Sequence, residues 1–206
     1  MPADRRILFF GDSFVAGVGD PTGLGWVGRV VAASHLAELP LTAYNLGVRG
    51  DTSADVAARF EAEAGARMRV ATASHGVVLG FGANDMTEQD KRLRVAPGQA
   101  ANTLGRLIDL ARASGNAVFV VGPPPVGDRD QDERIRELSN QLAHVATHHG
   151  VPFVATAMGL RAHDGWRDEA AANDGSHPGA GGYSALAELV LGAGWLGWLG
   201  AVGPGA

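Results

Sequence analysis

The chain has 206 residues, a length that fits one domain with one large core, and we take residues 1–206 as a single domain. Its net charge of -5 at pH 7 argues against a nucleic-acid-binding surface, which normally carries clustered excess lysine and arginine. The chain contains no cysteine, so a disulfide, a thiolate metal site and a cysteine nucleophile are all excluded.

Five short segments are apolar throughout and end in small or turn-forming residues. This pattern is expected of β-strands that helices cover on both faces, as in a parallel sheet. The predicted strands are residues 7–10, 42–46, 76–81, 117–121 and 151–155.

Helix-length segments alternate with these strands. In chain order, the predicted helices are residues 25–39, 52–64, 97–114, 130–149 and 182–191. The second opens with a capping-box-like T-S-A-D, and Pro97 suits the first turn of the third. The fourth has the clearest pattern, because acidic residues open it, one stripe is apolar, and Gly150 follows its closing histidines. The alternation predicts one doubly wound α/β domain.

The two ends of the chain bear on its location. The first apolar run, residues 7–10, is too short for the core of a signal peptide, so we expect a cytoplasmic protein. Residues 189–206 carry no charge, but their glycines disfavour a helix in the second half, and their length is at the lower limit of a membrane span. We therefore expect a last core helix and an apolar tail packed on the domain, without stable membrane insertion. The alternative is a surface that meets a lipid substrate or a dimer partner.

Four clusters of small and polar residues follow the predicted strands or precede the last helix. They are G-D-S at 11–13, N-L-G at 45–47, G-A-N-D at 82–85 and D-G-S-H-P at 174–178. In an open parallel sheet, the loops at the carboxyl ends of the strands form the natural crevice for a ligand. We therefore expect all four clusters at one edge of the sheet.

These clusters contain the groups that acyl transfer needs. The Ser13 hydroxyl is a poor nucleophile until a base removes its proton, and a histidine such as His177 suits that role. Asp174 lies three residues before His177 and can orient its ring. The backbone N–H groups of Ser13 and Gly47 and the side-chain amide of Asn84 are candidate donors to an oxyanion. We predict Ser13, Asp174 and His177 as catalytic residues, with Ser13, Gly47 and Asn84 as the oxyanion hole. We expect activity to rise as the histidine loses its proton.

The same segments resemble the sequence blocks of the GDSL hydrolases, also called SGNH hydrolases, from Phe9 to Tyr183. F-F-G-D-S-F-V-A-G resembles the first block with its serine, and Y-N-L-G-V-R-G-D-T-S resembles the second with its glycine. G-F-G-A-N-D-M resembles the third block with its asparagine, and D-G-S-H-P-G-A-G-G-Y resembles the last with its aspartate and histidine.

The resemblance implies a three-layer α/β/α flavodoxin-like fold with a five-stranded parallel sheet. It also implies hydrolysis of esters or thioesters without a metal or cofactor, at a shallow site that accepts varied acyl chains. The G-D-T-S that begins at Gly50 is similar to that of members acting as thioesterases and lysophospholipases.

Other patterns in the chain are weaker. A serine after a strand is often a helix N-cap, which is the alternative interpretation of Ser13. G-L-G-W-V-G at 23–28 does not follow a predicted strand, so a dinucleotide site is not expected. His144 and His148 have a spacing that can bind zinc, but the sequence offers no third ligand. No G-x-S-x-G occurs, which disfavours an α/β-hydrolase elbow. The remaining unpatterned histidines, interpreted as surface or satisfied core residues, are His35, His75 and His163.

Several polar residues adjoin the predicted site. Asp12, Asn45 and Asp85 are expected to hold their loops through hydrogen bonds to the backbone, because short side chains of this type do so readily. Arg49 and Asp51 either line the substrate entrance or form a solvated pair.

Two enzymatic functions and one binding function fit these observations. The first is a cytoplasmic serine hydrolase, an esterase, lipase or acylhydrolase, that cleaves a carboxylic ester or thioester bond of a small-molecule substrate through an acyl-enzyme. The second is a carbohydrate O-acetylesterase with the same residues, although an aromatic content of 6% gives little sign of a sugar-stacking surface. Trp195 and Trp198 in the apolar end of the chain favour an apolar acyl group. A binding module without turnover is disfavoured, because all the chemical groups are present.

Overall fold

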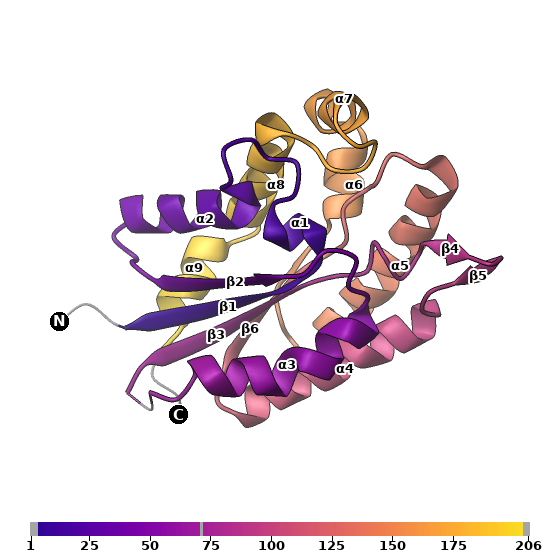
Figure 1. Ribbon diagram of the computed structural model, residues 1–206. Helices are drawn as coiled ribbons and strands as arrows, with labels where there is room; N and C mark the ends of the chain where they lie inside the picture. The colour runs from indigo at the N-terminus through magenta and orange to yellow at the C-terminus, as the bar shows by residue number, and fades with distance from the viewer. Residues whose placement is uncertain (1–3, 71, 204–206) are drawn as a thin grey trace.

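A five-stranded parallel sheet forms the centre of the computed structural model, which describes residues 4–70 and 72–203 (Figure 1). The strand order is β2-β1-β3-β6-β7. Each strand overlaps one predicted strand, and the order is that of flavodoxin-like folds, so the predicted fold class is confirmed. The strands are β1 (Arg5–Gly11), β2 (Thr42–Gly47), β3 (Ser74–Gly80), β6 (Ala117–Val121) and β7 (Phe153–Val154).

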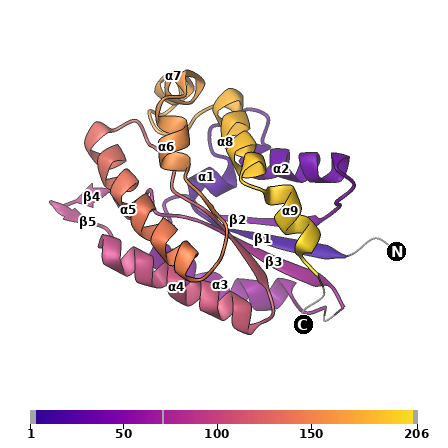
Figure 2. The ribbon, with the colours of Figure 1, turned by 180° about the vertical axis from the view of Figure 1, so that it is seen from behind.

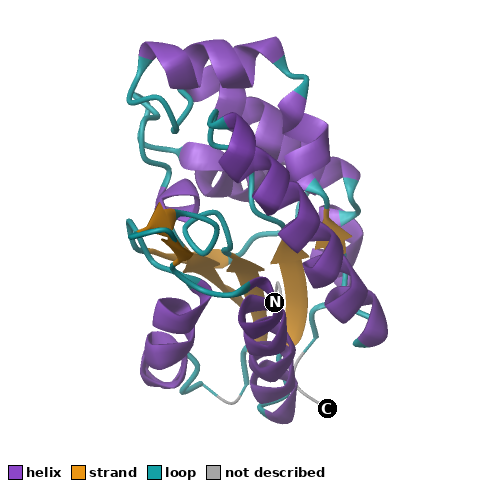
Figure 3. Ribbon diagram, turned by 90° about the vertical axis from the view of Figure 1, so that its right-hand side faces the viewer, coloured by secondary structure: helices purple, strands orange, loops and turns teal. Residues whose placement is uncertain are grey.

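Helices cover both faces of the sheet and complete three layers, which Figure 3 shows with the sheet in the middle. One face carries α3 (Ser53–Arg67), α4 (Pro97–Ala113) and α5 (Arg129–His148) (Figures 1 and 2). The other carries α2 (Gly25–Leu36), α8 (Ala180–Gly192) and α9 (Trp195–Ala201). The five predicted helices correspond to α2, α3, α4, α5 and α8, and Thr52 and Asp55 form the expected capping box of α3.

The apolar strands have partners on both faces. Phe9 contacts Trp26 of α2 and Trp195 of α9, with ring centroids 5.7 Å apart in each case. The next residue, Phe10, points to the opposite face and contacts Phe60 of α3 at 4.8 Å. Both Phe9 and Phe10 are fully buried, which explains why the strand is an uninterrupted apolar run.

Where the sequence predicted an apolar tail, the structure has a further helix, α9. It begins after Gly194, which adopts a left-handed φ of 91°. Trp195 is fully buried against Phe9 and Phe119, and a Cβ on Gly76, near the amino end of β3, would lie 2.9 Å from the Trp198 ring. The two tryptophans therefore pack on the core away from the carboxyl ends of the strands, and the interpretation that they favour an apolar acyl group is wrong. Residues 204–206 of the predicted tail lie outside the described residues.

Within residues 4–70 and 72–203, no single helix has the length and apolarity to cross a membrane. Helices α8 and α9 reach that length and hydropathy only together, as a pair bent by 56°.

The sequence analysis did not identify five short elements, because segments this short show little periodicity. His163, interpreted as a surface or core residue, is the N-cap of one of them, α7, and its Nδ1 accepts the Trp166 N–H at 3.1 Å. The five elements are α1 (Ser13–Ala16), β4 (Glu88–Gln89), β5 (Arg92–Leu93), α6 (Thr156–Arg161) and α7 (Asp164–Ala172).

Candidate active site

Three of the four polar clusters meet at the carboxyl edge of the sheet. Gly11, the last residue of β1, pairs in register with Gly47 of β2 and with Gly80 of β3. The G-D-S and G-A-N-D clusters therefore leave neighbouring strands at the same level. Between β1 and β3 the strand order reverses, which is the position where open α/β sheets bind ligands. The fourth cluster arrives on residues 173–179, between α7 and α8, which we call the histidine loop (Figure 1).

The histidine loop brings His177 into contact with Ser13, 164 residues away along the chain. The distance from Ser13 Oγ to His177 Nε2 is 2.7 Å, and the distance from His177 Nδ1 to Asp174 Oδ2 is also 2.7 Å. An ionised carboxylate only accepts hydrogen bonds, so the hydrogen of the second bond is on Nδ1. Nε2 of the neutral ring is then left to accept the Ser13 hydroxyl hydrogen. This arrangement connects the three side chains in the order that proton transfer requires.

The Asp174 carboxylate is held by the histidine loop itself. Its Oδ1 accepts the backbone N–H groups of Ser176 and His177 at 3.0 and 2.8 Å. Burial opposes ionisation of Asp174, but the hydrogen bonds from His177 and Ser176 outweigh it and lower the pKa to about 2. The side chain is therefore ionised at neutral pH and faces the His177 ring as an anion.

Glu169 of α7 fixes the other end of the histidine loop. Its Oε1 and Oε2 accept the N–H groups of Gly181 and Gly182 at 3.1 and 2.7 Å, so it satisfies the first turn of α8 from a neighbouring helix. Asn173 supports the same loop, because its Nδ2 donates to the His177 carbonyl at 3.1 Å. Nothing in the sequence near Glu169 predicts this role, since no local pattern shows that a helical glutamate reaches the start of another helix.

The turn after β1 sets the position of Ser13. Asp12 is the N-cap of α1, and its side chain accepts the Phe14 N–H at 2.9 Å, so the alternative N-cap role of Ser13 belongs to Asp12. Ser13 is the first residue of α1, where a backbone N–H has no partner within the helix. Helix α1 packs so closely on β2 that a Cβ on Gly47 would collide with the backbone nitrogen of Ala16. Glycine is therefore needed at position 47 for α1 and β2 to approach each other.

The three predicted oxyanion donors differ in their present partners. Asn84 Nδ2 donates one of its two hydrogens to the Asp51 carbonyl at 2.9 Å, which leaves the second available. The Gly47 N–H, in contrast, donates to Asn45 Oδ1 at 3.0 Å. Asn45 also donates to the Val15 carbonyl at 2.7 Å, so it holds α1 as predicted and engages the Gly47 donor at the same time.

Arg59 of α3 connects the two sides of the site, and the sequence analysis did not identify it. Its Nη2 donates to the Gly11 carbonyl at 2.9 Å, and its Nε donates to the Asp51 carboxylate at 2.8 Å. The backbone of Asp51 in turn accepts from Asn84. Since Asp51 pairs with Arg59, the Arg49–Asp51 pair considered above is not formed, and Arg49 is exposed.

Two buried carboxyl groups lie beneath the site. Asp85 is fully buried and accepts the N–H and hydroxyl of Ser53, so it holds the start of α3. Asp12 is 1% exposed, and burial raises its pKa to about 7, although the Phe14 N–H opposes this change. Both side chains hydrogen-bond to the backbone, as the sequence analysis expected.

The weaker sequence patterns lie elsewhere. G-L-G-W-V-G runs from a loop into α2, which begins at Gly25, and does not follow a strand. Across residues 4–70 and 72–203, His144 and His148 belong to no group of three or more side chains that could hold a metal.

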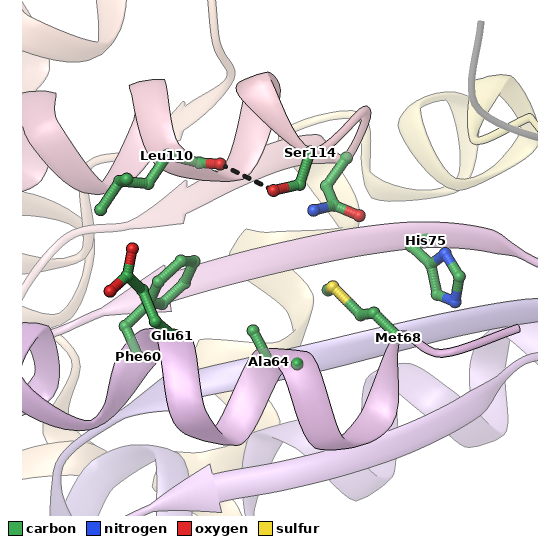
Figure 4. Close-up of a pocket in the computed structure, with 9 residues that line it drawn as sticks. Phe60, Glu61, Ala64, Met68, His75, Leu110 and Ser114 are labelled. Atoms are coloured by element: carbon green, nitrogen blue, oxygen red, sulfur yellow. Dashed lines mark hydrogen bonds between the residues drawn. The ribbon is translucent and has the colours of Figure 1, made fainter. Parts of the chain in front are cut away.

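A cavity of about 340 Å³ between α3 and α4 is also separate from the site (Figure 4). It is lined by Phe60, Met68 and Leu110, together with His75 near the amino end of β3. His75 Nε2 is buried and has no hydrogen-bond partner among the described residues, which corrects the view of His75 as a satisfied residue. Burial lowers the pKa of His75, and this favours the uncharged ring in that position.

One sequence family and several solved structures are similar to this chain. The sequence model of the GDSL-like lipase/acylhydrolase family matches residues 9–185. A comparison with curated proteins finds no match.

Among solved structures, TesA is similar, with 26% identity and a TM-score of 0.74 over 92% of this chain and 97% of TesA. The lipase/acylhydrolase from Enterococcus faecalis has 24% identity and a TM-score of 0.72, over 98% of this chain and 99% of that one. A catalytic mutant of Axe2, an acetylxylan esterase from Geobacillus stearothermophilus, has 22% identity and a TM-score of 0.76, over 96% and 97% of the two chains. At these identities the last two show a shared fold.

Proposed function

Because the chain belongs to the GDSL-like lipase/acylhydrolase family and is a hydrolase of ester bonds, we propose that it cleaves carboxylic esters or thioesters through an acyl-enzyme on Ser13. The observation that carries this proposal is the pair of 2.7 Å contacts that link Ser13, His177 and Asp174. We also propose that the substrate is a small molecule and that the protein is cytoplasmic.

The first step is attack by the Ser13 hydroxyl oxygen on the carbonyl carbon of the substrate. His177 Nε2 accepts the hydroxyl proton, and the ring becomes an imidazolium whose Nδ1–H remains bonded to Asp174. The ionised carboxylate stabilises this positive charge and holds the ring in place. His177 then returns the proton to the leaving alcohol or thiol, which gives the acyl-enzyme. Water repeats the sequence and releases the acid.

The oxyanion of the tetrahedral intermediate needs donors that are already in place. The Ser13 N–H and the second N–H of Asn84 supply two of them. The Gly47 N–H becomes a third donor when its hydrogen is shared between the oxyanion and Asn45 Oδ1, or when its bond to Asn45 breaks. Arg59 supports this side of the site, because it holds the Gly11 carbonyl and the Asp51 side chain together.

Labelling with a fluorophosphonate tests the role of Ser13. One label per chain, located on Ser13 by peptide mapping, is expected for the wild type, and none for Ser13→Ala. The control variant Ser114→Ala changes an exposed serine at the far end of α4 and should label normally. Labelling that persists in Ser13→Ala would overturn the assignment.

The alternative function is deacetylation of a carbohydrate by the same residues. The likeness to Axe2 at 22% identity concerns the fold and does not select this substrate. A panel of p-nitrophenyl esters from acetyl to palmitoyl, run beside acyl thioesters and acetylated xylan, separates the two functions. Cleavage of acetylated xylan far faster than butyryl or octanoyl esters would favour the alternative.

A further inference from the structure

A cavity of about 530 Å³ lies against the histidine loop, on the side formed by α5, α6 and α7. Arg129 at the start of α5, Arg161 at the end of α6 and Arg167 in α7 all line it. We call it the arginine pocket. Gly175, between the proposed orienting aspartate and the base, forms part of its wall.

The charges around the arginine pocket favour an anion. Two acidic residues also line it. One, Asp132, is partly buried, which raises its pKa, and its carboxylate accepts the Val126 N–H at 2.6 Å. The other, Asp168, is exposed. Three guanidinium groups against two carboxylates leave the lining of the pocket with an excess of one positive charge.

The present partners of these arginines do not prevent ligand binding. Arg167 pairs with Asp164 at 2.6 Å, and Arg161 with Glu133 at 3.8 Å, but all four side chains are 48% exposed or more. Such surface pairs contribute about 0–1 kcal/mol, so an anionic ligand can replace them.

Arg129 differs from the other two arginines in its surroundings. It forms no ion pair in the part of the chain that the structure describes. It also occupies the first position of α5, where the helix dipole disfavours a cation. Asp128 and Asp130 adjoin Arg129 in the sequence and offset the helix dipole, but the Arg129 guanidinium itself is exposed and free to bind an anion in the arginine pocket.

The geometry of the reaction connects the arginine pocket to the substrate. The leaving group receives its proton from His177 Nε2, so the alcohol or thiol portion departs on the side of the histidine loop. The same loop supplies Gly175 to the pocket wall. Trp166, which also lines the pocket, stacks on Phe14 at 5.9 Å, and Phe14 contacts the His177 ring at 4.8 Å.

We propose that the arginine pocket binds a phosphate or carboxylate group on the alcohol or thiol portion of the substrate, and that the enzyme therefore prefers anionic esters and thioesters. This inference rests on the proposed function. Guanidinium groups suit it, because their paired N–H donors match the oxygens of phosphate and carboxylate. A phosphate of this kind occurs in nucleotide-containing thiols and in lipid headgroups.

Matched substrates test the proposal. One pair is octanoyl-coenzyme A and octanoyl-N-acetylcysteamine, which share the thioester and the cysteamine unit, whereas the phosphates, with the adenosine and pantoyl groups, belong to coenzyme A alone. The other is a lysophosphatidic acid and the monoacylglycerol with the same acyl chain. We expect the wild type to favour the anionic member of at least one pair about tenfold in kcat/KM, and added salt to reduce this preference. The pair that shows it identifies the source of the phosphate.

The variant Arg129→Gln/Arg167→Gln should lower kcat/KM for the preferred anionic substrate about tenfold and leave its uncharged partner within about twofold. The matched control, Arg106→Gln, changes an exposed arginine on α4 and should alter neither. Equal losses on charged and uncharged substrates, or no preference in either pair, would overturn the proposal.

Binding without turnover separates this inference from the proposed function. Calorimetric titration of Ser13→Ala with coenzyme A and with glycerol 3-phosphate should detect binding of at least one, and the two arginine substitutions should weaken it. If binding follows the arginines but uncharged esters are hydrolysed equally with and without Ser13, the proposed function fails and the anion site stands. If neither compound binds, the anion site fails, whatever the outcome of the labelling experiment.

Discussion

Replacing Asp12 by asparagine should remove a pH-dependent loss of stability. Asp12 is buried beside Ser13, and burial raises the pKa of its carboxyl group from 3.8 to about 7. Asparagine has nearly the same shape and keeps an oxygen that can accept the Phe14 N–H, so the N-cap of α1 is preserved. The substitution therefore changes the titration of this position and little else.

The sign of the effect follows from the two states of the chain. In the unfolded chain Asp12 releases its proton above about pH 4, whereas in the folded protein it keeps the proton until about pH 7. Between these values the unfolded state binds fewer protons, so raising the pH lowers the free energy of unfolding. The rise of the pKa from 3.8 to about 7 lowers the free energy of unfolding by about 4 kcal/mol, because one pKa unit corresponds to about 1.4 kcal/mol. Above pH 7 the loss stays constant.

Urea unfolding at pH values from 4 to 8 measures this effect. Asp12→Asn should match the wild type near pH 4 and exceed its free energy of unfolding by a few kcal/mol at pH 8. Asp90→Asn serves as the control, since Asp90 is exposed and its left-handed φ of 52° also suits asparagine. An advantage of Asp12→Asn that is the same at pH 4 and pH 8 would refute the reasoning.

Three further variants address the site. Asn84→Ala removes a proposed oxyanion donor and should lower kcat about 100-fold or more, with a melting temperature within a few degrees of the wild type. A loss below about tenfold would contradict the proposed role. Glu169→Ala leaves two N–H groups of α8 without their carboxylate and should cost about 2 kcal/mol, or a melting temperature lower by about 4–8 °C, together with a lower kcat. The control Glu188→Ala changes an exposed residue of α8 and should alter neither the melting temperature nor kcat. Equal effects of the two variants would contradict the capping role of Glu169. Gly47→Ala should push α1 away from β2 and lower kcat about 100-fold or more, because the added Cβ would collide with Ala16. The control Gly98→Ala places its Cβ in open space and should be nearly neutral. Normal activity in Gly47→Ala would contradict the packing argument.

Much of the site was predictable because two of its side chains come from a single turn, in the histidine loop. Asp174 and His177 are three residues apart, and the backbone of that one turn brings their side chains within 2.7 Å. The G-D-S and G-A-N-D clusters follow apolar strands, and parallel strands bring such clusters to the same edge of a sheet. A spacing that fixes a turn, or an apolar run that fixes a strand, is a property of neighbouring residues and is visible in the sequence.

Contacts between distant segments were decided by packing. Glu169 reaches α8, Arg59 reaches the end of β1, and Asn45 takes the Gly47 N–H, although none of these side chains has a pattern that identifies its partner. The two tryptophans near the end of the chain show that sequence alone does not reveal such packing. In the sequence they suggested a surface for an apolar ligand, whereas α9 buries Trp195 in the core.

The sequence by itself determined the alternation of strands and helices, the parallel sheet and the predicted set of reactive groups. Those features follow from hydrophobic periodicity and from residues a few positions apart. Only the tertiary structure decided that Ser13 lies 2.7 Å from His177, which donors are already engaged, and that three arginines surround one cavity beside the histidine loop. These arrangements depend on how helices from separate parts of the chain pack together, and no local pattern specifies that packing.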